Sequence, residues 1–352
     1  MLRLVLGRAG TGKTALLFSE IAGRCARRES GSFLIVPEQY SHEAERELAL
    51  RCGDTASLYA EVLSFSRLAH RVAIGCGGSG RVYMDKPGRF LQLSLALEQM
   101  GGALSVYGGS ARSPERMAQL LSALDELRFG CAAPDTLRKA AGSSTAALSD
   151  KLRDLALLQE ALDALSAQSG ADPAGRLDVL AAQLPGFTWL RGAKFYIDGF
   201  TDFTAQERRV VRALLPLADV TVCLTCDDPV SGSEVFSLAR RTARALCDAA
   251  AEDGVDTKIL SVPHAETRAP LAFLEENLFG WTEEARDAAG SIRLVRASGI
   301  AAECELAAAE MRRLVRETPC RWRDIAVAVR GFEDYRAPLE EACRRAGVPL
   351  YT

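Results

Sequence analysis

The first fourteen residues contain the feature that most constrains the fold of this chain. In the stretch LRLVLGRAGTGKTALLFSEI, the apolar run Leu2–Leu6 precedes a glycine-rich loop and a helix-forming segment. Gly7, Gly12, Lys13 and Thr14 satisfy the pattern G-x-x-x-x-G-K-[S/T], and they do so between a strand and a helix, as this pattern requires. We therefore expect an α/β domain with a parallel sheet that begins with a phosphate-binding loop.

The residues of this loop have predicted roles in holding a nucleoside triphosphate with Mg²⁺. Glycines let backbone N–H groups curl around the β-phosphate, and the helix N-terminus adds its positive dipole end. Lys13 would reach the β- and γ-phosphates, and the Thr14 hydroxyl would ligate Mg²⁺. A glycine-rich turn with a solvated lysine is the alternative, which the complete motif disfavours. The predicted ATP-binding residues are Gly7, Arg8, Ala9, Gly10, Thr11, Gly12, Lys13 and Thr14.

A second acidic residue is expected far along the chain, because a P-loop domain also holds Mg²⁺ through an acid at another strand end. The segment FYIDGFTDFTAQE, residues 195–207, leads from an apolar strand to Asp198. Asp198 is therefore predicted as the second magnesium-binding residue, beside Thr14. The alternative is that Asp198 caps the following helix, a role that suits Thr204 better.

Composition excludes some classes of protein and leaves others open. The chain has 352 residues, 48% of them hydrophobic and 25% charged, which is typical of a globular protein with two or more domains. Its net charge of −3 argues against a strongly basic nucleic-acid binder, although a local basic groove is compatible with it. No signal peptide and no membrane-spanning run is visible. We therefore expect a cytoplasmic protein that neither crosses nor binds a membrane.

The ten cysteines are scattered, apart from Cys223 and Cys226. This usage fits reduced, buried thiols better than a disulfide framework. The lone CxxC lies in the apolar run VTVCLTC, which favours two strand residues over a metal or redox site.

The periodicity of the chain changes twice, which predicts its division into domains. Strands alternate with helices over 1–84 and again over 186–290, and these two parts are expected to share one sheet. Between them, residues 85–185 carry apolar residues at helical spacing and are predicted to form an inserted helical domain. Residues 291–352 are predicted to begin another α/β domain, with a strand over 324–330, and the chain stops where a further strand is expected.

The order of these motifs resembles the superfamily 1 (UvrD-like) DNA helicases, and more closely the AddB subunits of bacterial AddAB helicase–nucleases. The matching phrases span nearly the whole chain: LGRAGTGKT, LIVPEQYSHEAE, VLSFSRLAHRV, LSDKLRDL, YIDGFTDFTAQE and WRDIAVAVRGFEDY. The resemblance implies the N-terminal part of a longer chain. It implies a RecA-like domain 1A with the P-loop, an inserted domain 1B and the start of domain 2A. The family's nuclease and iron–sulfur cysteines would lie beyond Thr352.

The resemblance also implies a function and a partner. The chain would be the ATP-binding, motor-like part of an enzyme that processes DNA double-strand breaks for homologous recombination. An AddA-like subunit would carry the main motor. In this superfamily the strand corresponding to YID ends in Asp-Glu, so Gly199 stands where the general base is usual. Losing such a base costs about 10²–10⁴-fold in rate. We therefore expect ATP binding with weak hydrolysis.

Contacts with single-stranded DNA are predicted in the segment SFSRLAHRV. In related helicases this neighbourhood meets DNA, where an aromatic ring stacks on a base and basic groups meet phosphate. The candidate residues are Phe65, Ser66, Arg67 and Arg71. The equal alternative places Phe65 in the core and the arginines on a solvated face.

Two other functions stay open at the level of sequence. A P-loop at the N-terminus is also compatible with a small-molecule or nucleotide kinase, which would need an arginine-rich lid and a second acid nearer than Asp198. A non-catalytic structural subunit stabilised by nucleotide is the other alternative, although a vestigial P-loop would be expected to have lost Lys13 or Thr14.

Overall fold

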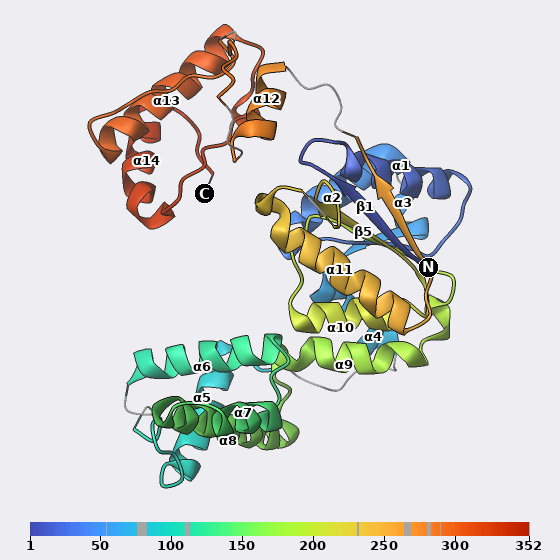
Figure 1. The fold of residues 1–352 in the computed structure, drawn as a ribbon, viewed down its shortest axis with the longest axis vertical. Coiled ribbons are helices and arrows are strands. Elements are labelled where there is room, and N and C mark those ends of the chain that lie inside the picture. The colour runs from blue at the N-terminus through green and yellow to red at the C-terminus, as the bar shows by residue number, and fades with distance from the viewer. Residues whose placement is uncertain are drawn as a thin grey trace. The chain divides into compact units, whose positions relative to one another are not determined.

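The computed structural model describes residues 1–53, 55–75, 83–109, 113–230, 232–263, 269–279, 283–288 and 290–351. They fall into two compact units, residues 1–267 and residues 268–352 (Figure 1). Within the described residues, no helix is both long and apolar enough to cross a membrane.

The described residues of the first unit form one sheet of six strands in the order β3-β2-β4-β5-β1-β6. Every neighbouring pair is parallel. The sheet confirms the predicted α/β class. Because all strands run in one direction, their carboxyl ends meet at one edge, where parallel sheets bind ligands. The strands are β1 (Leu2–Gly7), β2 (Ser32–Ile35), β3 (Ala60–Leu63), β4 (Lys194–Ile197), β5 (Asp219–Thr225) and β6 (Thr257–Ser261).

Apolar cores cover both faces of this sheet. Along β1 the side chains alternate, so that Leu4 and Leu6 enter one core and Val5 enters the other. The Val5 core contains residues of α1 (Lys13–Ala26) and α2 (Ser41–Cys52), with α3 (Ala56–Tyr59) beside β3. The opposite core contains α4 (Phe65–Gly75), α9 (Arg176–Gln183), α10 (Ala205–Leu214) and α11 (Ser237–Glu252).

Between β3 and β4 the chain forms helices that pack around a separate core. These helices are α5 (Lys86–Met100), α6 (Pro114–Phe129), α7 (Pro134–Gly142) and α8 (Ala146–Ser169). Leu93, Leu120 and Leu158 are among the buried side chains of this core. By contrast, α9 places Leu180 in the core of the sheet. The domain limits given by the sequence patterns stay a prediction.

The second unit contains α12 (Ala269–Asn277), α13 (Ile300–Glu317) and α14 (Phe332–Ala346). Cys304 and Met311 of α13 pack against Leu339 and Cys343 of α14. The predicted strand over 324–330 is wrong for this structure: Trp322–Asp324 is a 3-10 turn, and 325–329 belong to no strand. Ile325 has extended backbone angles, φ −112° and ψ 132°. A strand also needs a hydrogen-bonded neighbour, and none pairs with this segment within the described residues.

Candidate nucleotide-binding site

The loop between β1 and α1 has the backbone shape that its glycines predict. Gly10 and Gly12 adopt φ of +76° and +87°, a left-handed conformation that side chains disfavour. Gly12 is also the residue that precedes α1, so the loop turns directly into the helix N-terminus. Ala9, Gly10 and Gly12 are exposed at the carboxyl edge of the sheet.

Lys13, the first residue of α1, is held against this loop. Its Nζ donates to the carbonyl oxygen of Gly7 at 2.7 Å and to that of Arg8 at 2.8 Å. The residue is only 8% exposed. Burial lowers the pKa of Lys13 from its ordinary value. The ammonium group is therefore held within the loop.

Thr14 and Asp198 lie in direct contact. The Thr14 hydroxyl donates to Oδ2 of Asp198 at 2.6 Å, although 184 positions separate the two residues. Asp198 directly follows β4, and its backbone N–H donates to Ile35 at the end of the neighbouring β2. The hydroxyl and the carboxylate are oxygen ligands of the kind that Mg²⁺ takes. The two residues expected to hold Mg²⁺ are thus brought together.

Gly199 follows Asp198 with φ of +81°. A β-carbon built at Gly199 would lie 3.2 Å from Cδ of Pro37. The position at which the resemblance led us to expect a catalytic base is therefore one where this backbone disfavours most side chains.

A cavity of about 520 Å³ opens beside these groups. Its apolar wall includes Phe18 and Val36, and the Arg51 guanidinium lies 5.5 Å from the centre of the Phe18 ring. Gly12, Lys13, Thr14 and Asp198 line the same cavity, so it joins the loop to the strand-end acid. Tyr40 of the turn after β2 also lines it and is 54% exposed.

Comparison with protein families assigns the chain to one of them. A model described as "ADDB, N-terminal" matches residues 4–275. The chain belongs to the AddB family. The resemblance inferred from the motifs is thereby confirmed.

Relatives in this family share one name, that of the B subunit of an ATP-dependent helicase/deoxyribonuclease. Those from Desulforamulus reducens and Moorella thermoacetica are each 34% identical over 99% of this chain. The one from Desulforudis audaxviator is 35% identical over 99% of the chain. In each case the match covers 32% of the relative. The chain thus spans about a third of the length of these AddB relatives.

The candidate DNA-contacting residues of this AddB-family chain lie in two different environments. Phe65 is 4% exposed and packs against Phe200 and Phe203, with ring centres 5.5 Å and 6.2 Å away. Its ring is therefore in the core and is not free to stack on a base in this conformation. Ser66 is partly exposed on the first turn of α4.

The two arginines of the same segment are exposed and already paired. Arg67 donates to Glu45 at 2.6 Å. Arg71 donates to Glu61 at 3.4 Å, and its guanidinium lies 5.3 Å from the Trp189 ring centre. Exposed ion pairs of this kind contribute little to stability, so a phosphate could replace these carboxylates at low cost.

Sequence reasoning missed one acidic group at the P-loop, Asp227, which follows β5. Arg8 of the loop lies 3.8 Å from this carboxylate and 5.8 Å from the Phe236 ring centre. Arg240 of α11 lies 3.8 Å from the same carboxylate. Asp227 thus ties the loop to α11. The sequence contained a signal for this residue. The letters CDD, residues 226–228, follow an apolar run and end on acids, as YID at residues 196–198 does.

Proposed function

We propose that residues Gly7–Thr14, together with Asp198, bind ATP with Mg²⁺. The observation that carries this proposal is the 2.6 Å bond between Thr14 and Asp198 at the cavity beside the P-loop. The residues fit the ligand, because loop N–H groups and the ammonium of Lys13 suit phosphate while two oxygen side chains suit the cation. Bound Mg²⁺ would supply neutralisation of charge on the phosphate oxygens.

The residues of this chain would perform binding and orientation. Lys13 would exchange the carbonyl oxygens of Gly7 and Arg8 for phosphate oxygens, and Thr14 and Asp198 would hold the cation between them. Weak hydrolysis follows from Gly199, because no carboxylate stands at that position to remove a proton from water.

The chain is proposed to be the ATP-binding, helicase-like part of the B subunit of a two-subunit helicase–nuclease. This enzyme would process DNA double-strand breaks for homologous recombination, with an AddA-like partner carrying the main motor. Membership of the AddB family and the shared name of its relatives support this role. The nuclease and its iron–sulfur cluster would belong to the remainder of such a subunit. A kinase function has no support from the family.

The domain assignment is part of this proposal. Residues 1–84 and 186–290 would be the ATP-binding domain 1A, residues 85–185 domain 1B, and residues 291–352 the beginning of domain 2A. Ser66 and Arg67 would meet single-stranded DNA at the first turn of α4, and Arg71 would meet it further along this helix, while Phe65 would support α4 from the core.

One observation favours a second candidate, a nucleotide-stabilised subunit without turnover. Gly199 has a left-handed φ and lies against Pro37, so this position is built around a glycine. Such a subunit would bind ATP as tightly but would not hydrolyse it.

Isothermal titration of the 352-residue chain with Mg-ATP tests the proposal. The Lys13→Ala variant should lose binding while keeping its circular dichroism spectrum, because the side chain contacts loop carbonyls instead of the apolar cores. Lys139→Ala, on an exposed surface of α7, is the matched control and should bind normally. Unchanged ATP affinity in folded Lys13→Ala would rule out the P-loop assignment.

A further inference from the structure

A second cavity of the first unit, of about 420 Å³, shares no lining residue with the cavity beside the P-loop. Its wall combines parts of the chain that are distant in sequence: Ser66 at the start of α4, Phe129 at the end of α6, Arg176 at the start of α9, and Thr204 before α10. None of the roles proposed above for ATP uses this cavity.

Among the residues that the structure describes, Arg176 is the cation of this wall without an anionic partner. Its guanidinium carbon lies 4.3 Å from the centre of the Tyr83 ring. Its Nε is buried and has no hydrogen-bond partner among the residues that the structure describes. Within the same ranges Arg176 forms no ion pair. Because Arg176 lines the cavity without an ion pair to a described residue, its guanidinium is suited to receive an acceptor from a ligand.

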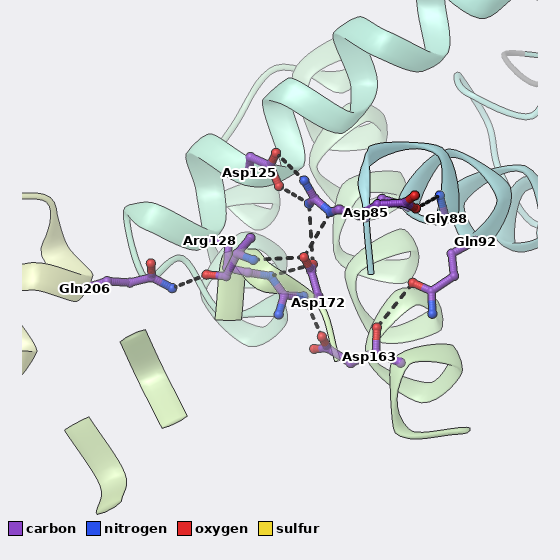
Figure 2. A network of polar contacts seen from close by, with 11 residues as sticks. Asp85, Gly88, Gln92, Asp125, Arg128, Asp163, Asp172 and Gln206 are labelled. Atoms are coloured by element: carbon purple, nitrogen blue, oxygen red, sulfur yellow. Dashed lines mark hydrogen bonds and ion pairs between the residues drawn. The ribbon is translucent and has the colours of Figure 1, made fainter. Parts of the chain in front are cut away.

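The other arginines near this wall are already neutralised. Arg89 of α5 donates to Asp125 of α6 at 2.9 Å and lies 3.0 Å from Asp172. Arg128 lies 3.8 Å from Asp172 and pairs with Asp163. Figure 2 shows Asp172 between Asp125 and Arg128, as the centre of this network. These bonds join α5, α6 and α8 to the segment before α9, so the wall of the cavity is fixed.

Gln206 fixes the opposite side. This residue is 1% exposed, and its Nε2 donates to the carbonyl oxygen of Ala174 at 2.9 Å and to Asp178 at 2.7 Å. Gln206 is labelled in Figure 2 with its bond toward the network. The first turn of α10 is therefore held to the first turn of α9.

Three helices begin at this cavity, with Ser66 in the first turn of α4, Arg176 opening α9, and Thr204 capping α10. Their N-termini add positive potential to the charge of Arg176. Glu207 also lines the cavity, but its carboxylate accepts from the backbone N–H of Thr204 at 2.8 Å in a capping box. The positive groups of the site are thus Arg176 and the three helix N-termini, and Glu207 is an acidic group of the same wall.

Phe129 adds an exposed aromatic ring to the same wall. It is 40% exposed, whereas apolar side chains elsewhere on α6, such as Leu120 and Leu124, are buried. An exposed ring beside an unpaired guanidinium is the combination that binds one unit of a single strand: the ring stacks on a base and the cation meets a phosphate.

We propose that this cavity binds one nucleotide unit of single-stranded DNA, with Arg176 on a phosphate and Phe129 against a base. The proposal rests on the DNA-processing function proposed above and adds a contact between α6 and α9 that the motifs did not indicate.

Fluorescence anisotropy of a labelled oligothymidylate of about 16 nucleotides, titrated with the 352-residue chain at several salt concentrations, tests this site. Arg176→Gln should weaken binding about tenfold and reduce the slope of log K against log salt by about 0.7, as for one lost phosphate contact. Phe129→Leu should weaken binding about fivefold without changing the slope. Arg153→Gln, an exposed arginine of α8, is the matched control and should bind as the wild type does.

The outcomes separate the site from the function. A wild-type chain that binds no oligothymidylate would contradict the DNA-processing role and this site with it. Wild-type binding with both variants unchanged would overturn the site alone. Weaker binding of Arg176→Gln with the wild-type slope would mean that Arg176 is only structural, and would also overturn the phosphate contact. If circular dichroism shows that Arg176→Gln is unfolded, the affinity of Phe129→Leu tests the site instead. The exposed Phe129 ring can be changed without creating a cavity in an apolar core.

Discussion

Gly199 lies directly against Pro37: a β-carbon at Gly199 would stand 3.2 Å from the proline Cδ, and the glycine backbone has φ of +81°. Gly199 follows the acid that bonds to Thr14, so this contact is part of the candidate ATP site. The glycine can thus reflect a lost catalytic base or a turn that requires glycine. Substitutions at this one position distinguish the two explanations.

Gly199→Ala should lower the free energy of unfolding by about 1–2 kcal/mol, because a side chain disfavours the left-handed conformation. Urea denaturation followed by circular dichroism measures this loss. Gly199→Asn is the matched control and should lose less, since asparagine populates this conformation more readily. Equal stability of wild type and Gly199→Ala would mean that the turn relaxes and the conformational explanation does not hold.

Gly199→Glu should bind ATP nearly as the wild type does and should raise DNA-stimulated hydrolysis measurably. The gain should fall well short of about 10²–10⁴-fold, because the added carboxylate lacks supporting groups and starts from a strained backbone. The rate of ATP hydrolysis should be measured in the two-subunit enzyme, with the P-loop lysine of the partner subunit mutated. The partner's own hydrolysis then does not mask the rate of this subunit. Flat turnover in a folded, ATP-binding variant would favour the nucleotide-stabilised subunit.

The parts of this site that sequence could predict are those written in short, local patterns. Gly10 and Gly12 adopt the left-handed angles that a P-loop needs, and the loop therefore followed from its motif. The Thr14–Asp198 pair was also predictable, because an apolar run ending on an acid places that acid at the ligand edge of a parallel sheet.

Non-local contacts explain what the sequence did not reveal. Residues 325–329 have the apolar pattern of a strand, but a strand also requires a paired neighbour, which no periodicity encodes. Strand β6 was missed because Ile259 and Leu260 remain 46% and 40% exposed, so it lacks the buried apolar pattern of the other strands. The contact of Gly199 with Pro37 joins two loops, and only the fold brings them together.

Asp154 is predicted to stabilise the helical segment of the first unit. It is 1% exposed, and its carboxylate accepts from the backbone N–H groups of Ser105, Val106 and Tyr107 at 3.0, 2.7 and 3.0 Å. Asp154→Ala should cost about 3 kcal/mol in urea denaturation, because buried donors lose their acceptor. Asp163→Ala on the same helix, whose carboxylate is 56% exposed, should cost under about 1 kcal/mol. Similar losses for both variants would count against this role.

Acid should weaken the second unit through Glu310. The hydrogen bond from Arg313 lowers the pKa of Glu310 from 4.5 to about 2. A carboxyl whose pKa is lower in the folded state stabilises the fold above its unfolded value, and this contribution is lost as pH falls from 4.5 toward 2. The protection factors of α13 amides, which are the intrinsic exchange rates divided by the observed rates, should therefore fall over this range in the wild type, and less so in Glu310→Gln. Glu333→Gln, which removes a carboxylate without an ion pair in the described part of the unit, is the control. Identical pH profiles for wild type and Glu310→Gln would exclude the effect.

Removal of Mg²⁺ should distinguish the residues of the candidate ATP site that hold the cation from those that hold phosphate. Thr14 and Asp198 supply oxygen ligands, whereas Lys13 and the loop N–H groups face phosphate. Thr14→Val should therefore weaken ATP binding about tenfold in the presence of Mg²⁺ and should leave the weaker binding measured in EDTA nearly unchanged. Asp198→Asn should behave in the same way, because the amide keeps the shape of the side chain but not its charge. Lys13→Ala provides the contrast, since it should lose binding under both conditions. Isothermal titration with and without Mg²⁺ gives these affinities for all variants. If Thr14→Val lowered affinity equally in EDTA, then the 2.6 Å bond to Asp198 would hold the loop in shape and would not mark the cation's position.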